Sequence, residues 1–296
     1  MSAIQHKMEL KTDESNLPAY LAITAGVFCI GCSGIFVKIA NVEGTVSAFY
    51  RLFIAAFAIV PFWAAGRPVW PKLQNMGWIA LGGLFFALDL VLWNTGLLLT
   101  SAATATLLAN NAPLWVGLGA LFLLRERLSG KFWSGLFIAL SGMTFIVGGN
   151  VWRELRFNSG DLMSIGASLF YAAYLLVAQK VRKRIDTLTF TALSMATGKI
   201  ILFPVSILSG HRMIGFSTKT WLALLCLGLF SQLAGWLAIN KAVGRLGAAS
   251  VSVCLLAQPV VTAVLGIFFL NESLQPSDLI GGTLVLIGIY IVNQRR

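Results

Sequence analysis

The sequence has few charged residues, only two histidines and four cysteines in 296 residues. Asp, Glu, Lys and Arg make up 11% of the chain, whereas soluble globular domains carry about 25%. So few charges cannot cover a water-soluble surface, so most of the surface should face lipid. The scarcity of histidine also argues against a metal centre. The single C-x-x-C, Cys29 to Cys32, is better explained by close helix packing, and no metal or other cofactor is predicted.

Sequence motifs for enzymatic chemistry are also missing. The chain has no Gly-rich phosphate loop, no nucleophile elbow and no H-E-x-x-H motif. Residues 1–17 are polar and lack the apolar core of a signal peptide, so they are predicted to be a cytoplasmic N-terminal tail. These absences favour a membrane protein that is not an enzyme.

Apolar residues dominate instead, at 57% of the chain with a mean hydropathy of +0.82. A membrane-spanning helix needs about 20 apolar residues, so about ten such helices would occupy nearly the whole chain. The sequence predicts an all-α integral membrane protein with spans at 18–39, 45–65, 76–98, 102–124, 132–149, 160–181, 187–208, 219–241, 247–270 and 277–293.

The basic residues give these spans an orientation. A net charge of +11 would suggest nucleic acid binding in a soluble protein. Here most Lys and Arg lie in the tail, in alternate loops and at the C-terminus, which is the pattern of cytoplasmic segments. We therefore expect a multi-pass protein of a bacterial inner membrane, with both termini cytoplasmic, the lipid bilayer as its surroundings and no nucleic acid partner.

An internal repeat divides the chain. Residues 101–142 match residues 247–288 without a gap, and the match pairs Pro113 with Pro259, Glu126 with Glu272 and Gly135 with Gly281. Five crossings per repeat is an odd number, so the second repeat must be inverted relative to the first. We predict two inverted five-helix repeats, at 18–149 and 160–293. Such repeats commonly provide alternating access to a site near the bilayer midplane.

Both copies carry short motifs at matching places. The first copy has Ser101-Ala102-Ala103, Asn110 to Trp115 and Arg125-Glu126-Arg127-Leu128; the second has Gly247-Ala248-Ala249, Gln258-Pro259 and Asn271-Glu272-Ser273-Leu274. These motifs resemble the drug/metabolite transporter superfamily, in its ten-helix EamA-type branch, over nearly the whole chain. The resemblance implies a secondary transporter that exports amino acids, drugs or other metabolites. In size and topology the chain is similar to YddG-like aromatic amino-acid exporters.

Asp89, deep in the third span, is the first candidate site residue. An ionised carboxylate in the bilayer is costly unless it has a partner or water. It is either a site for a substrate ammonium or a proton, or a structural group that is hydrogen-bonded to neighbouring helices. A weaker repeat match pairs Asp89 with Gln232 and Trp93 with Trp236, which predicts that these residues line one cavity.

Further candidates are basic, amide, proline and aromatic residues within spans. Lys199 either pairs with Asp89 or holds a substrate carboxylate, or its long stem extends towards an interface. Arg51 either clamps a carboxylate or anchors its helix at the headgroups. Pro113 and Pro259 are predicted gating bends or static kinks, with amides nearby at Asn110, Asn111 and Gln258. Aromatic residues that either contact an aromatic solute or pack between helices are Tyr50, Phe85, Phe86, Trp115, Tyr171 and Tyr174.

Three functions are consistent with these features. The first is a secondary exporter of small organic metabolites, with amino acids, including aromatic ones, as the expected substrates. The second is a multidrug exporter of lipophilic cations, and the third is an intramembrane enzyme or scaffold, which the inverted repeat disfavours. Protons as a coupling ion and uncoupled facilitation both stay open.

Overall fold

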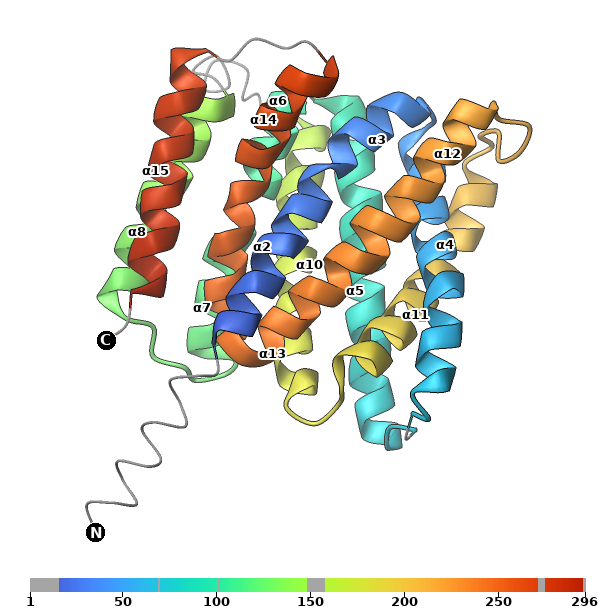
Figure 1. The fold of residues 1–296 in the computed structure, drawn as a ribbon, viewed down its shortest axis with the longest axis horizontal. Helices are drawn as coiled ribbons and strands as arrows, with labels where there is room; N and C mark the ends of the chain where they lie inside the picture. Colours follow the sequence, from blue (N-terminus) through green and yellow to red (C-terminus); the bar gives the residue numbers. More distant parts are fainter. Residues whose placement is uncertain (1–15, 69, 101, 148–157, 271–274, 295–296) are drawn as a thin grey trace.

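The computed structural model describes residues 16–68, 70–100, 102–147, 158–270 and 275–294. Most of the predicted tail and the segment 271–274, which carries Glu272, lie outside the described residues. The described part is helical and contains no strand (Figure 1). Its helices are α2 (Leu17–Gly31), α3 (Ser33–Ala40), α4 (Gly44–Ala65), α5 (Leu73–Leu99), α6 (Ala102–Ala109), α7 (Ala112–Phe122), α8 (Gly130–Val147), α10 (Ser159–Arg182), α11 (Thr187–Leu208), α12 (Thr218–Cys226), η1 (Leu227–Ala234), α13 (Gly235–Cys254), η2 (Leu255–Ala257), α14 (Gln258–Leu270) and α15 (Pro276–Asn293).

The predicted membrane spans are confirmed. Eight helical stretches among the described residues are long and apolar enough to cross a membrane. One of them, Thr218–Leu265, has 48 residues and reverses direction near Gly247, where φ is 82°, so it holds two crossings (Figure 1). A further predicted span is the shorter apolar helix Gly130–Ile146. The described residues therefore account for ten crossings.

Several spans are interrupted. The first is broken at Cys32, the fourth at Asn110 and Asn111, and the ninth by the 3-10 turn η2. The last two breaks lie at matching places of the two repeats, and Pro113 and Pro259 follow them in the first turns of α7 and α14. Proline is tolerated there because the first N–H groups of a helix have no intrahelical acceptor. The prolines therefore begin half-helices rather than bend continuous ones.

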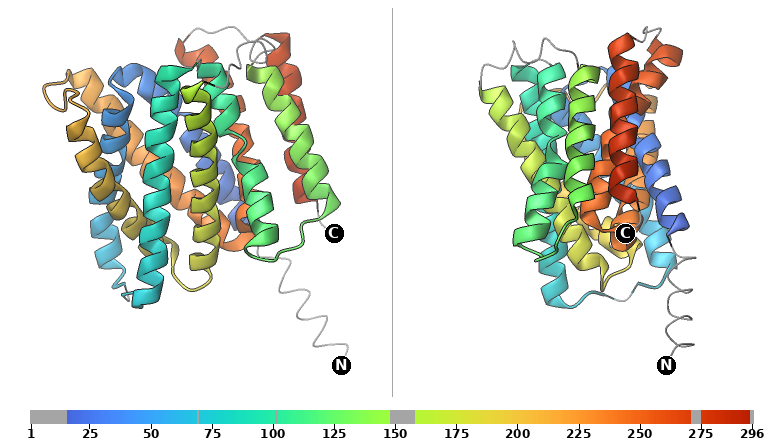
Figure 2. Two further views of the ribbon diagram at one scale, coloured as in Figure 1. Left: turned by 180° about the vertical axis from the view of Figure 1, so that it is seen from behind. Right: turned by 90° about the vertical axis from the view of Figure 1, so that its left-hand side faces the viewer.

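The helices α8 and α15 show the inversion directly. They lie side by side, apart from most of the bundle (Figure 2). A Cβ atom on Gly135 would lie 2.6 Å from the carbonyl oxygen of Gly288, and one on Gly142 would lie 2.5 Å from that of Gly281. The sequence match relates Gly135 to Gly281 and Gly142 to Gly288. Exchanging the repeats therefore converts one contact into the other, as an inverted pair requires.

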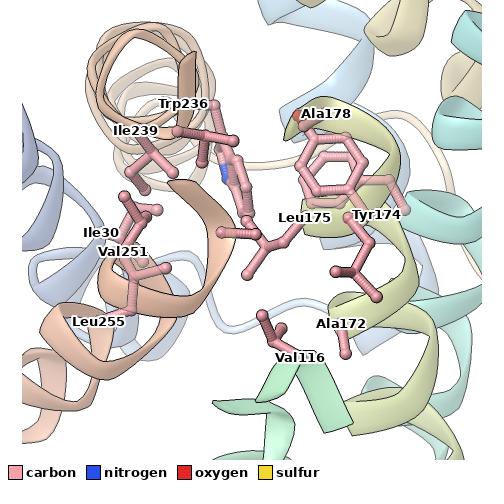
Figure 3. Packing of buried hydrophobic residues seen from close by; sticks show 14 of the residues in the cluster. Ile30, Val116, Ala172, Tyr174, Leu175, Ala178, Trp236, Ile239, Val251 and Leu255 are labelled. Atoms are coloured by element: carbon pink, nitrogen blue, oxygen red, sulfur yellow. The ribbon is translucent and has the colours of Figure 1, made fainter. Parts of the chain in front are cut away.

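The two repeats also interlock elsewhere. The third span of the first repeat, α5, packs along the first span of the second repeat, α10. The corresponding pair, α13 and α2, packs in the same way. Figure 3 shows the resulting core, in which Trp236 faces Tyr174, Leu175 and Ala178 of α10. Because each repeat packs its third span against the first span of the other, the cavity between them is lined by both repeats.

Candidate functional site

A cavity of about 420 Å³ lies between the two repeats. Its volume lies in the range of small-molecule sites, about 300–1,000 Å³. Polar residues from both repeats line it among apolar and aromatic ones. The lining residues are Ile30, Ser33, Gly34, Arg51, Phe86, Asp89, Leu90, Trp93, Thr106, Ala109, Asn110, Tyr171, Trp236, Gln258, Pro259, Thr262 and Ala263.

An aromatic layer closes the cavity on the side of the two termini. The ring of Phe86 stacks on Tyr174 at 4.9 Å and meets the edge of Trp236 at 4.6 Å, measured between centroids. Beneath it the Asn240 Nδ2 atom donates to the Tyr174 hydroxyl (2.9 Å) and to the Thr191 hydroxyl (3.0 Å). The cavity therefore lies in the half of the bundle away from the termini.

Asp89 and Arg51 bring opposite charges to the same cavity. Asp89, on α5, is half-buried because one face of its carboxylate meets the cavity, and Arg51, on α4, is 9% exposed. The two groups interact electrostatically, but they form no direct ion pair within the part of the chain that the structure describes. Both charges are thus available to a ligand between them.

Gln232 lies behind Arg51 rather than on the cavity wall. It belongs to the π-helical segment η1 and its side chain is fully buried. The Arg51 Nε atom donates to Gln232 Oε1 at 2.7 Å. Segments of π-helix often occur at functional sites, and hydropathy gives no signal for them. The sequence thus pointed to Gln232 but not to its contact with Arg51.

The predicted tryptophans and Gln258 do line the cavity. Trp93 and Trp236 stand on its wall, and Tyr171 and Gln258 line it as well. Ser33, Thr106 and Thr262 also line it and were not predicted. All three lie within a few residues of a helix break or of a half-helix start, and only the proline-marked breaks had a sequence signal.

The two asparagines at the fourth-span break differ in position. Asn110 lines the cavity, and its Nδ2 donates to the carbonyl of Thr106 at 2.8 Å. Asn111 donates to the carbonyl of Leu107 at 3.0 Å and does not line the cavity. The Asn111 amide therefore pairs the Leu107 carbonyl that the break frees, whereas the Thr106 carbonyl also accepts from the Asn110 backbone N–H at 3.0 Å. Of the two prolines, Pro259 lines the cavity, whereas Pro113 does not.

Lys199 lies away from the cavity. Its Nζ is 4.5 Å from the ring centroid of Phe57, and 56% of Phe57 is exposed. Lys199 therefore stands on the outer face between α4 and α11. The structure does not bring it to Asp89; Arg51 is the basic group that meets the carboxylate in the cavity.

The sequence model of the EamA-like transporter family matches residues 17–148 and again residues 158–294. The chain belongs to this family. It is 26% identical over 292 residues to an uncharacterized transporter of Archaeoglobus fulgidus, with 95% of this chain and 99% of the relative covered. It is 27% identical over 228 residues to a probable terminal-alkyne amino-acid exporter of Streptantibioticus cattleyicolor, covering 76% and 75% of the two chains.

A solved structure has the same fold. A crystal structure of a protein superposes on this EamA-type chain with a TM-score of 0.79 at 18% identity, over 93% of this chain and 97% of the other. At this identity the likeness concerns the fold alone. The family match identifies the chain as a multi-pass membrane transporter of small molecules.

Proposed function

We propose that this EamA-type transporter exports amino acids, including aromatic ones, across the bacterial inner membrane by alternating access. The observation that carries the proposal is the pair of opposite charges in one cavity, Asp89 and Arg51, without a direct ion pair. A zwitterion offers an ammonium group to the carboxylate and a carboxylate to the guanidinium. Charge-assisted hydrogen bonds of this kind are among the stronger ones.

The cavity wall supports the choice of aromatic and other apolar side chains. Phe86, Trp93, Tyr171 and Trp236 surround the two charges. Aromatic pairs in edge or offset-stacked geometry add to the free energy of burial. The relative named as a probable terminal-alkyne amino-acid exporter supports the same substrate class.

Arg51 distinguishes this proposal from export of lipophilic cations. A cation drawn to Asp89 and the aromatic wall would also meet the buried guanidinium, and like charges repel at close range. We therefore expect a permanent organic cation to compete poorly with phenylalanine.

The fold supports a transport cycle by alternating access. With the termini in the cytoplasm, as the Lys and Arg distribution indicates, the cavity lies on the outer side and the aromatic layer forms the inner closure. In the other state the cavity opens to the cytoplasm, and the inverted repeats can reach it when each adopts the conformation that the other has here. Asp89 is the group through which a proton would couple to this exchange.

Uptake into liposomes tests the proposal. Purified protein is reconstituted, and uptake of labelled phenylalanine and, separately, threonine is measured with and without a pH gradient. Saturable phenylalanine uptake that is lost in Asp89→Asn is the expected result, and a dependence on the gradient would establish proton coupling. Uptake no greater than that of empty liposomes would refute amino-acid transport. If Asp89→Asn takes up as much phenylalanine as the wild type, the role assigned to Asp89 is wrong.

A further inference from the structure

We propose that Gln232 determines the charge class of the substrate, because it holds Arg51 through a neutral acceptor. This inference rests on the proposed function: it takes Asp89 and Arg51 as the groups that bind an amino acid. It concerns a residue that does not itself line the cavity. Gln232 is therefore a positioning residue that acts through Arg51.

The contact is short and specific. The Arg51 Nε donates to Gln232 Oε1 at 2.7 Å, and this is the one hydrogen bond of the Arg51 side chain among the described residues. It joins the second span of the first repeat to the π-helical segment η1 in the third span of the second. With Nε engaged, the two Nη groups of the guanidinium remain for a carboxylate in the cavity.

The other half of the Gln232 amide has no comparable role. Its Nε2 is buried and has no hydrogen-bond partner among the residues that the structure describes. An unpaired buried N–H group is costly, so the amide is not explained by the bonds that its nitrogen makes. What the position supplies is a carbonyl oxygen without a negative charge.

The neutral side chain of Gln232 matters because the charges of Asp89 and Arg51 in the cavity cancel. One carboxylate, Asp89, faces one guanidinium, Arg51, and the sum is neutral, as it is for a zwitterion. A carboxylate at 232 would hold Arg51 equally well but would neutralise it, leaving Asp89 in excess. The cavity would then suit a cation that carries an amine and no carboxylate. The weaker repeat match, which relates Gln232 to Asp89, shows an acid and an amide at equivalent places.

Two ligands that differ only in charge test the inference. L-phenylalanine is a zwitterion, and 2-phenylethylamine is the same molecule without its carboxylate. Binding of each to purified full-length protein is measured by ligand-induced thermal shift and by competition with labelled phenylalanine. The variants are Gln232→Glu and Gln232→Met, and the charge-matched control is Gln294→Glu, an exposed residue at the end of α15.

In the Gln232→Glu variant we expect the ratio of phenylalanine affinity to phenylethylamine affinity to fall by about tenfold or more. In Gln232→Met, which removes the acceptor without adding charge, phenylalanine should weaken while phenylethylamine binds as in the wild type. Gln294→Glu should leave both unchanged. Because Glu exchanges an unpaired N–H group for an oxygen, no existing hydrogen bond is lost.

Other outcomes contradict the inference in distinct ways. If both ligands weaken equally in both variants, Gln232 has a structural role only. If the ratio in Gln232→Glu equals that of the wild type, its charge does not reach the substrate. If the wild type binds no phenylalanine, the proposed function itself fails. Should Gln232→Glu not fold, the comparison of the two ligands in Gln232→Met still decides the matter.

Discussion

At the scale of single residues, Arg51 has two tasks that need different parts of its guanidinium. Its Nε donates to Gln232, and we assign its Nη groups to the substrate carboxylate. Lysine keeps the charge but has a single compact ammonium in place of the planar fork. We expect Arg51→Lys to raise the KM for phenylalanine by about tenfold, with a smaller change for phenylethylamine. Uptake kinetics in liposomes measure this, and an unchanged KM would count against the carboxylate role.

For Lys199, in contrast to Arg51, we expect substitution to leave transport nearly unchanged. Because its ammonium stands over Phe57 on the outer face, removing it should not affect the cavity. We expect Lys199→Met to transport phenylalanine within about twofold of the wild type, as surface substitutions typically have small effects. A loss similar to that of Asp89→Asn would show that Lys199 reaches the substrate in another conformation.

The outcome for these residues shows what hydropathy can predict at this scale. Asp89, Arg51 and Lys199 are each a charged residue within an apolar span, and the sequence predicts a functional role for all three on that ground. Position along a span gives the depth of a residue in the bilayer, but not the direction of its side chain. Asp89 and Arg51 face inwards and Lys199 faces outwards, and a periodicity analysis cannot separate them when the helix is apolar on all sides.

Among the helices, the contact between α8 and α15 depends on glycine. A methyl group on Gly142 would lie 2.5 Å from the backbone oxygen of Gly281, so the two helices would have to move apart. We expect Gly142→Ala to destabilise the protein by about 1–3 kcal/mol, seen as a lower melting temperature in detergent. Gly77→Ala is the matched control: its Cβ meets nothing within 4 Å, and it should be neutral or stabilising by up to about 1 kcal/mol.

The start of α11 supplies a pH-dependent prediction. Asp186 caps this helix by accepting from the Thr189 N–H at 2.9 Å. Partial burial favours the protonated acid, but the hydrogen bonds from Thr189 and from the Asp186 backbone, together with the charge of Arg182, lower the pKa of Asp186. A lowered pKa stabilises the fold above the unfolded value, near 4, and this contribution is lost as the pH falls through the folded value.

We therefore expect Asp186→Ala to cost about 1 kcal/mol at neutral pH and progressively less towards about pH 3. Asp186→Asn should keep the cap at every pH, because asparagine is an equally good N-cap residue. Melting temperatures of the three proteins across this range provide the measurement. A pH-independent difference between wild type and Asp186→Ala would contradict the role of the carboxylate charge.

The helices also show why some breaks were predictable and others were not. Pro113 and Pro259 lack an N–H group, which marks the breaks in the fourth and ninth spans in the sequence itself. The break at Cys32 and the π-helical register of η1 have no such residue. These features depend on which carbonyl accepts from each backbone N–H group once the helices have packed. Hydropathy does not predict that hydrogen-bond register.

For the molecule as a whole, a buried polar link centred on Gln179 joins the two repeats on the side of the termini. Gln179 of α10 donates to Glu126 at 2.7 Å and accepts from the Ala248 N–H at 2.6 Å, next to the reversal at Gly247. Opening on this side must separate these groups. The link therefore stabilises the conformation described above relative to the opposite one.

We expect Gln179→Leu to leave the Ala248 N–H buried and unpaired, at a cost of about 1–3 kcal/mol to this conformation. The population should then shift towards opening on the side of the termini. Hydrogen exchange measured by mass spectrometry should become faster around Gly247 and stay unchanged in α15, which serves as the internal reference. Equal exchange in variant and wild type would show that the link does not control this equilibrium.

The bond between Arg51 and Gln232 spans 181 positions of the chain. At roughly 5–20 residues per second, the ribosome makes Gln232 on the order of 10–40 s after Arg51. During that interval the guanidinium is without its final acceptor. Asp89 follows Arg51 far sooner and belongs to the same repeat. Before it ever meets a substrate, Asp89 is therefore the group that can neutralise Arg51 while the second half of the protein is still being synthesised.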